Sequence, residues 1–360
     1  MIKAINGWRA VFALMIVLFH VGVTGLEEMT WAGVTFFLMA SGFLLALKHP
    51  MDELNADSYR QFVKRHALKL FPLHWLSLIL WIVAMALLGV LVVKPVALAL
   101  NVTLLHSWSL SHSVYFSYNK FSWFLSTLLF CYLCYPLLAK WFMPLPLRVK
   151  CYFLAFVTVL AIIVLAGTGD YGRTALYVFP PMRLIDFVIG MTLAHLCQTM
   201  KVGKVLGKSA NGNDAELVAI ALLSLMIFSF RTYKGLLPWS DAILWWIPVG
   251  FILVVSKLYD RREGFVGMIL SSRPMQWLGD ISFEIFILQG IAALIYNYGV
   301  APVLGHLGLW ASSPFDAADA AAAGTNPYTL IAWFILPLDI LLAWIVNRLF
   351  TRPVRRWLSR

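Results

Sequence analysis

The feature that most constrains this chain is its succession of long apolar segments joined by short polar connections. A helix needs about 20 apolar residues to cross the hydrocarbon core of a bilayer. Only 12% of the 360 residues are charged and 61% are hydrophobic, whereas soluble domains are about one quarter charged. A water-soluble globule is therefore excluded. Helices are expected, because the runs are too long and too uniformly apolar for barrel strands.

The hydropathy pattern predicts an all-α, polytopic membrane bundle of about ten transmembrane helices, forming one domain over residues 1–360 with no fused soluble domain. The expected spans are Trp8 to Thr24, Trp31 to Leu47, Leu73 to Val93, Phe121 to Leu138, Cys151 to Ala166, Pro181 to Thr199, Ala215 to Phe230, Asp241 to Ser256, Ile281 to Tyr298 and Leu330 to Phe350. With both termini cytoplasmic, about 22 of the 28 lysine and arginine residues lie inside, as the positive-inside rule requires.

The net charge of +11 is explained by this topology, so no nucleic-acid partner is expected. The start of the chain is interpreted as an uncleaved first span rather than a signal peptide, because Arg9 and His20 interrupt its apolar run. The four cysteines lie in apolar stretches, so we interpret Cys131-x-x-Cys134 as packing and expect no metal site.

Two expected external segments are long: Lys94 to Lys120, rich in serine, histidine and aromatic residues, and Gly299 to Pro327, which includes the alanine-rich stretch Asp316 to Gly324. Neither an internal repeat nor an inverted duplication of broken spans is visible, which weakens a transporter interpretation.

Ionisable residues inside apolar spans are candidates for function, because lipid excludes charge. Those in this chain are Arg9, His20, Arg183, Asp186, His195, Asp241, Glu284 and Asp339. Arg9 and His20 are eleven residues apart, so a helix places them on one face, roughly 16 Å apart along its axis. His20 is then either a histidine hydrogen-bonded to a neighbouring helix or a buried neutral imidazole able to take a proton from an alcohol.

A cationic cluster precedes the third span. Arg65 and Lys69 are spaced i and i+4 on one helical face, with Lys64 beside them. Such a cluster serves either as a topology anchor that contacts lipid or as a site for a phosphate-rich cytosolic ligand.

Two further motifs lie within spans. Arg183 and Asp186, spaced i and i+3, form either a same-helix ion pair or part of a functional interior. Ser41 and Gly42 allow either close helix packing or a site-lining role.

Several motifs in order along the chain resemble those of the acyltransferase 3 family. These are Asn6-Gly-Trp-Arg9 with Leu18-Phe-His20, Gly33-Val-Thr-Phe-Phe through Ser41-Gly-Phe-Leu44, Lys64-Arg-His-Ala-Leu-Lys69-Leu-Phe-Pro72, Trp123-Phe-Leu125 with Tyr135-Pro-Leu-Leu138, Arg183-x-x-Asp186-Phe-x-x-Gly190 and Trp277-Leu-Gly-Asp-Ile-Ser-Phe283. The chain departs from the family pattern at four positions: Asp186 replaces a usual glutamate, Lys69 a common arginine, Leu128 an acidic residue of longer members, and Gln289 a frequent histidine.

The resemblance implies an integral membrane O-acyltransferase that moves an acyl group, usually acetyl, from cytosolic acyl-CoA to a hydroxyl of an extracytoplasmic or lipid-linked glycan. It implies that His20 is the base or acyl-handling residue and that Arg9, Arg183 and Asp186 share its catalytic interior. Arg65, Lys69, Lys64 and Ser41 would form the acyl-CoA site.

The resemblance also implies an inner (cytoplasmic) membrane location. The expected partners are the lipid bilayer and either a second copy of the chain or a separate protein that handles the acceptor. The alternatives are a transporter or flippase of a lipid-linked glycan and, less favoured, a non-catalytic sensor or scaffold, for which intramembrane charges would have no purpose.

Overall fold

The computed structural model describes residues 2–21, 23, 26–48, 55–168, 170–199, 212–233, 245–260, 264–306 and 327–358, and all regular structure in these ranges is helical. The longer helices are α1 (Lys3–His20), α2 (Glu27–Lys48), α3 (Ala56–His66), α4 (Phe71–Leu87), α7 (Trp123–Trp141), α8 (Leu147–Ala166), α10 (Pro180–Thr199), α12 (Gly212–Tyr233), α14 (Trp246–Leu258), α17 (Ser282–Ile295) and α20 (Pro327–Val346). The all-α membrane bundle predicted from the sequence is thereby confirmed.

Shorter helices connect these elements. They are η1 (Leu68–Leu70), α5 (Pro95–Val102), η2 (His106–Trp108), α6 (His112–Tyr115), α9 (Asp170–Val178), α15 (Phe265–Leu270), α16 (Arg273–Asp280), η3 (Tyr296–Val300), α18 (Ala301–His306), η4 (Asn347–Thr351) and α21 (Arg352–Leu358).

Seven helical stretches of the described chain are long and apolar enough to cross a membrane. They are Glu28–Lys48, Ala56–Leu87, Trp123–Trp141, Leu147–Val164, Gly212–Thr232, Ser282–Val303 and Phe334–Leu358. Helices α1 and α10 contain ionisable residues that lower their apolar character, and they are not among the seven. Every one of the ten expected spans contains a helix, while the count of ten spans and the cytoplasmic position of the termini stay predictions.

The first span ends earlier than the sequence predicts. Helix α1 ends at His20 rather than running on to Thr24. The residues that follow, Val-Gly-Val-Thr-Gly, combine two glycines with three β-branched residues, which disfavours a helix. His20 therefore lies at a helix end with an exposed side chain, not deep within a span as expected.

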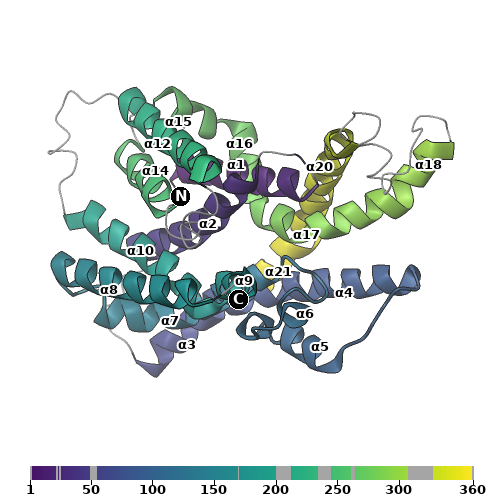
Figure 1. Cartoon of the computed structure of the whole chain (residues 1–360), viewed down its shortest axis with the longest axis horizontal. Coiled ribbons are helices and arrows are strands. Elements are labelled where there is room, and N and C mark those ends of the chain that lie inside the picture. Colours follow the sequence, from purple (N-terminus) through teal and green to yellow (C-terminus); the bar gives the residue numbers. More distant parts are fainter. Residues whose placement is uncertain are drawn as a thin grey trace.

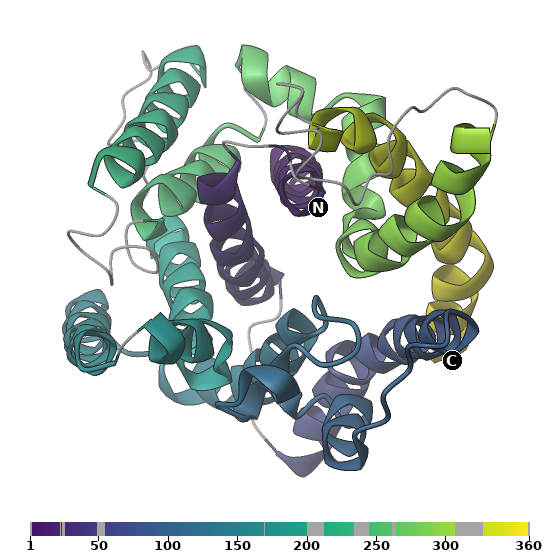
Figure 2. The ribbon, with the colours of Figure 1, turned by 45° about the vertical axis from the view of Figure 1, so that its right-hand side comes forward.

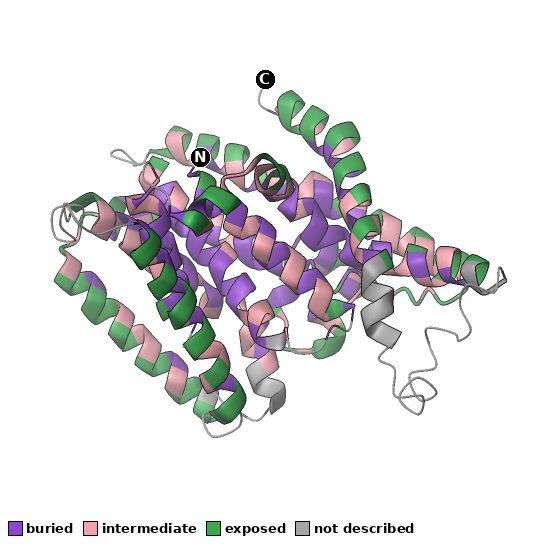
Figure 3. Cartoon of the chain, turned by 90° about the horizontal axis from the view of Figure 1, so that it is seen from above, coloured by how far each residue is buried: buried purple, intermediate pink, exposed green. Residues whose placement is uncertain are grey.

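Helices α1 and α2 lie in the middle of the molecule, surrounded by the other helices (Figure 2). The contact between α2 and α10 is the most extensive. Glycines allow the backbones of α2 and α10 to approach closely, because a Cβ added to Gly42 would lie 2.1 Å from the Phe187 carbonyl oxygen. The reciprocal contact of Gly190 with the Met39 carbonyl oxygen would be 2.0 Å. Buried residues concentrate on these inner helices, and exposed ones on the outer faces (Figure 3).

The segment between α4 and α7 folds back as α5, η2 and α6. Its buried side chains are held by hydrogen bonds: Ser107 donates to the Trp123 carbonyl at 3.0 Å, and the His74 imidazole contacts the Asn101 carbonyl at 2.7 Å. The His106 ring lies 3.2 Å from the Ser122 hydroxyl. Burial lowers the pKa of His106 to about 3, so this ring is neutral. These contacts fix the segment to the bundle.

The C-terminal helices return to the start of α4. Helix α20 continues through the π-helix η4 into α21, which lies next to the first turns of α4 (Figure 1). This path brings residues more than 280 positions apart, such as Lys69 and Arg355, into electrostatic contact. Helix α21 thereby contributes to a cavity whose other walls come from the N-terminal half and from α17.

Candidate active site

One cavity lined by described residues has a strongly basic lining. Its volume is about 460 Å³. Its walls are Arg9, Phe37, Ala40, Ser41, Leu44, Leu45, Lys48, Arg65, His66, Lys69, Leu70, Phe124, Leu128, Tyr132, Phe283 and Arg355. We call it the basic cavity. Five cationic side chains and no carboxylate are among these described residues, so it favours a polyanionic ligand.

Four sequence-predicted residues meet in the basic cavity: Arg9, Ser41, Arg65 and Lys69. The sequence predicts Arg65 and Lys69 on one continuous helix. The structure instead ends α3 at His66 and inserts η1, because Pro72 favours the first turn of a new helix. Both side chains still face the cavity. Lys64 is exposed on α3 and does not line it.

Arg9 joins the cavity to a polar cluster at its base. The carboxylates of Glu284 and Asp280 and the guanidinium of Arg355 all act electrostatically on Arg9. Glu284 is fully buried and accepts a hydrogen bond of 2.8 Å from the Asn347 amide. Arg9 thus lies near the buried Glu284 carboxylate and the exposed Asp280 carboxylate, while its half-buried side chain lines the cavity.

An aromatic layer closes the inner end of the basic cavity. Phe37 and Phe124 line the cavity, and Phe286 packs against both, with ring centroids 6.4 Å from Phe37 and 5.2 Å from Phe124. Phe121 packs on the far side of Phe286 at 6.4 Å. The layer thus joins the cavity to the residues around His20.

His20 lies beyond this layer. Its ring packs edge-on against Phe121 with centroids 4.8 Å apart. Its Nδ1 atom is 2.8 Å from the Ile16 carbonyl oxygen, which can only accept, so Nδ1 carries the hydrogen in this contact. The Nε2 lone pair is left to accept a proton. Lys120 acts electrostatically on the ring, and the buried Gln289 side chain makes a polar contact with it.

Three neighbouring helices run in the same direction from the basic cavity to the region around His20. Helix α1 carries Arg9 at the cavity and His20 beyond the layer, roughly 16 Å further along at 1.5 Å per residue. Helix α17 carries Phe283 at the cavity and Gln289 beside His20. Helix α4 follows Lys69 and reaches Trp81, which packs beside Phe121 across Gly290. The basic cavity and His20 therefore lie at opposite ends of one aromatic-filled path.

Arg183 and Asp186 are not brought to the basic cavity. They pair with each other at 2.9 Å, and both are buried. Arg183 also donates to the Tyr177 carbonyl and lies 4.1 Å over the Tyr177 ring, while Trp246 donates its indole hydrogen to Asp186. These contacts tie α9, α10 and α14 together and favour a structural role. A catalytic role for the pair stays a prediction.

Replacing Asp186 with asparagine is expected to lower the free energy of unfolding on the order of 3 kcal/mol, because Arg183 would keep a buried, uncompensated charge. Thermal unfolding in detergent measures this. The donor KM should stay unchanged, and the Asp186→Glu variant, which keeps the charge, should recover most of the stability. A raised donor KM with unchanged stability would instead assign the pair to the site.

Sequence reasoning missed several residues of the basic cavity. Lys48 and Arg355 were interpreted only as topology charges, and Tyr132 was not singled out. A signal for Lys48 was present, because it is seven residues after Ser41 and shares its helical face. No local pattern indicates Arg355, since only the packing of α21 brings it to the cavity.

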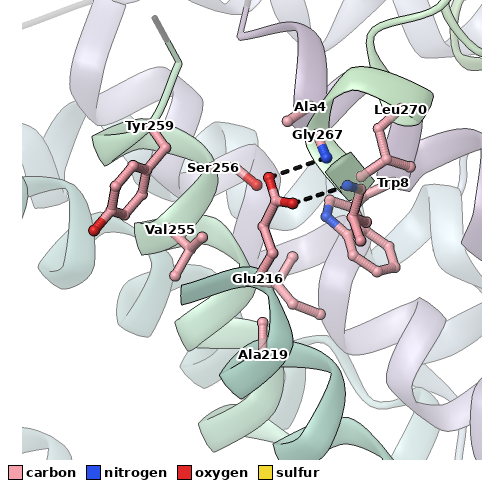
Figure 4. A pocket seen from close by; sticks show the side chains of 11 residues that line it. Ala4, Trp8, Glu216, Ala219, Val255, Ser256, Tyr259, Gly267 and Leu270 are labelled. Carbon is pink, nitrogen blue, oxygen red and sulfur yellow. Dashed lines mark hydrogen bonds between the residues drawn. The ribbon is translucent and has the colours of Figure 1, made fainter. Parts of the chain in front are cut away.

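A second pocket contains the carboxylate of Glu216, and hydrogen bonds from the backbone engage both of its oxygens. Glu216 of α12 accepts hydrogen bonds from the backbone N–H groups of Gly264, Val266 and Gly267 at 2.9 to 3.0 Å, at the start of α15. Figure 4 shows the bond from Gly267. The free volume is only about 20 Å³, which is room for a single water molecule. This pocket fastens α12 to α15.

The family model for an acyltransferase domain matches residues 2–348. The chain belongs to the acyltransferase 3 family. It is therefore an acyltransferase, and its apolar helices make it a multi-pass membrane protein. No curated protein and no solved structure matches this acyltransferase. Within the matched region lie Arg9, the basic residues of α3 and η1, and His20.

Proposed function

We propose that this acyltransferase moves an acetyl group from acetyl-CoA, held in the basic cavity, to a hydroxyl of a carbohydrate at His20. One observation carries the proposal. A cavity with five cations and a histidine with a free Nε2 lone pair lie at opposite ends of one aromatic-filled path. Donor and acceptor would thus approach from opposite sides of the membrane.

The cavity chemistry suits coenzyme A. Its pyrophosphate and 3′-phosphate carry several negative charges, which guanidinium and ammonium groups bind by charge-assisted hydrogen bonds. Arg65 and Arg355 act on Lys69 with like charge, so an anion among them relieves their repulsion. The slender pantetheine arm would lie along the apolar wall of the cavity that includes Phe37 and Phe124.

The reaction follows from the free nitrogen of His20. Nε2 takes the proton of the acceptor hydroxyl as its oxygen attacks the thioester carbon, a step worth about 10²- to 10⁴-fold. The resulting tetrahedral oxyanion lies near Lys120 and Gln289, which supply positive charge and a hydrogen bond. The carbon–sulfur bond then breaks, and the imidazolium returns the proton to the leaving thiolate.

The cellular setting follows from this direction of transfer. The positive-inside pattern supports a topology in which the basic cavity opens toward the cytoplasm and His20 lies toward the other face of the inner membrane. The acceptor is then an extracytoplasmic or lipid-linked glycan. A second copy of the chain or a separate protein would present it where the glycan is large.

A transfer assay tests the proposal. Purified protein in nanodiscs is incubated with acetyl-CoA labelled in the acetyl group and with candidate glycans, and the label is followed. Label in an ester of the glycan is expected. In a parallel assay with sealed proteoliposomes, movement of unmodified glycan across the bilayer, with the label still on CoA, would support the flippase alternative.

Arg65→Ala is expected to raise the KM for acetyl-CoA about tenfold and to leave the acceptor KM unchanged, because one exposed phosphate contact is lost. Arg60→Ala is the matched control, since Arg60 is an exposed arginine of α3 outside the cavity. Equal effects of both variants would remove Arg65 from the donor site.

A further inference from the structure

Cations are unusual on the expected outer side of the membrane, because the positive-inside rule concentrates them in the cytoplasm. The external segment Lys94 to Lys120 nevertheless begins and ends with a lysine, and it contains no aspartate or glutamate. Arg183 and Arg231, also expected on this side, each pair with a carboxylate at 2.9 Å. In the described part of the chain, neither Lys94 nor Lys120 forms an ion pair with a carboxylate. The charges of these two lysines are therefore available to a ligand.

Lys120 lies beside His20. Its Nζ atom is 5.2 Å from the centre of the Phe121 ring, and the centre of the His20 ring is 4.8 Å from the same point. Lys120 and His20 are both exposed, whereas Phe121 is buried. One ligand can therefore contact the ammonium group and the imidazole together from the solvent side. Lys120 also acts electrostatically on the imidazole.

The ammonium group of Lys120 has little compensation for its charge. The protein around it partly desolvates this group and lowers the pKa of Lys120. The face of the Phe121 ring supplies only a cation–π contact, which is a modest attraction at an exposed site. A negative charge on a ligand would favour the charged form of Lys120 and offset the desolvation.

The proposed reaction also favours a negative charge at this point. His20 becomes a cation when it takes the acceptor proton, and Lys120 then repels it. A carboxylate or phosphate on the acceptor, held by Lys120, would compensate the imidazolium as it forms. A neutral sugar carries no fixed charge with which to offset this repulsion.

We infer that the acceptor carbohydrate carries a carboxylate or a phosphate, and that Lys120 binds this anion beside the hydroxyl that His20 deprotonates. The inference rests on the proposed function and deepens it, because it names the acceptor class as an acidic sugar. Lys120 then positions the acceptor in addition to stabilising the oxyanion. The basic cavity lies at the other end of α1, so donor binding should not depend on Lys120.

The test compares acceptors that differ in charge and offer the same free hydroxyls. The p-nitrophenyl glucuronide is paired with its neutral primary amide, and p-nitrophenyl glucoside 6-phosphate with the neutral 6-O-methyl glucoside. Labelled acetyl-CoA is the donor, and glycerol is the non-sugar acceptor. Lys120→Met removes the charge from an exposed side chain of similar length, and Lys120→Arg keeps it. Lys94→Met is the matched control, because it removes the other unpaired lysine of the same segment.

We expect the wild-type KM for at least one anionic acceptor to be about fivefold lower than for its neutral partner. Lys120→Met should abolish this difference by raising the KM for the anion. It should lower kcat for both partners by one common factor, because the oxyanion loses a cation. Lys120→Arg and Lys94→Met should keep the difference, and the donor KM should stay within twofold of wild type in every variant. The pair that shows the difference identifies the anion as carboxylate or phosphate.

Three results would overturn the inference and leave the proposed function standing. They are equal KM values within both pairs for the wild type, a difference that persists in Lys120→Met or is lost equally in Lys94→Met, and transfer to glycerol but to none of the sugars. Absence of transfer to every acceptor, glycerol included, overturns the proposed function.

Discussion

Replacing His20 with alanine is expected to lower the rate of acyl transfer by about 10²- to 10⁴-fold, because the group that takes the acceptor proton is lost. The Nε2 atom is the free nitrogen of the ring, since Nδ1 is engaged by the Ile16 carbonyl. Binding of acetyl-CoA should be unchanged, because the basic cavity, the proposed donor site, lies at the other end of α1. Single-turnover transfer and equilibrium binding of labelled donor measure the two effects separately.

The side chain of His20 is exposed, so its removal should leave the fold intact. His195→Ala serves as the control, because this half-buried histidine of α10 lies outside the basic cavity and should transfer at the wild-type rate. A near wild-type rate in the His20 variant would remove the imidazole from the mechanism. Loss of donor binding together with transfer would assign His20 to the donor site instead.

Replacing Arg9 with alanine is expected to weaken acetyl-CoA binding by about 10²-fold, equivalent to about 2.7 kcal/mol. Arg9 lies at the base of the basic cavity, and the buried Glu284 carboxylate acts on it electrostatically. Loss of Arg9 removes a group that would donate hydrogen bonds to the phosphates of acetyl-CoA. It also leaves the Glu284 carboxylate uncompensated, and this negative charge repels acetyl-CoA. Titration with labelled acetyl-CoA measures the affinity.

Arg9→Lys should recover only part of this affinity, because an ammonium group cannot form the two-pronged contact of a guanidinium. Arg148→Ala, an exposed arginine at the start of α8, controls for a general loss of positive charge. If the Arg9 variant binds acetyl-CoA as tightly as wild type, the donor is not held in the basic cavity.

Much of the fold follows from the sequence, because apolar periodicity over about 20 residues reports directly on membrane helices. Each expected span contains a helix, and the α1 face that joins Arg9 to His20 forms as predicted. The end of α1 was misplaced because hydropathy does not distinguish a helix from an apolar segment rich in glycine and β-branched residues. The alanine-rich stretch Asp316 to Gly324 and Asp241 lie outside the described residues.

The candidate site was only partly predictable. Motifs close in sequence indicated Arg65 and Lys69, while Arg355 depends on a contact between the two ends of the chain. Arg183 and Asp186 were correctly paired as neighbours on one helix, but their partners Tyr177 and Trp246 come from other helices. Periodicity gives the face of a residue and not the helix that this face meets.

The most direct test of the account is the sidedness of transfer in sealed proteoliposomes. Labelled acetyl-CoA is supplied only outside, and a p-nitrophenyl glycoside that the protein acetylates in detergent is placed either in the lumen or outside. Labelled ester is expected in the lumenal glycoside, formed by the protein molecules whose basic cavity faces outward. Ester formed only when donor and glycoside share one compartment would contradict the arrangement of basic cavity and His20 on opposite sides of the membrane.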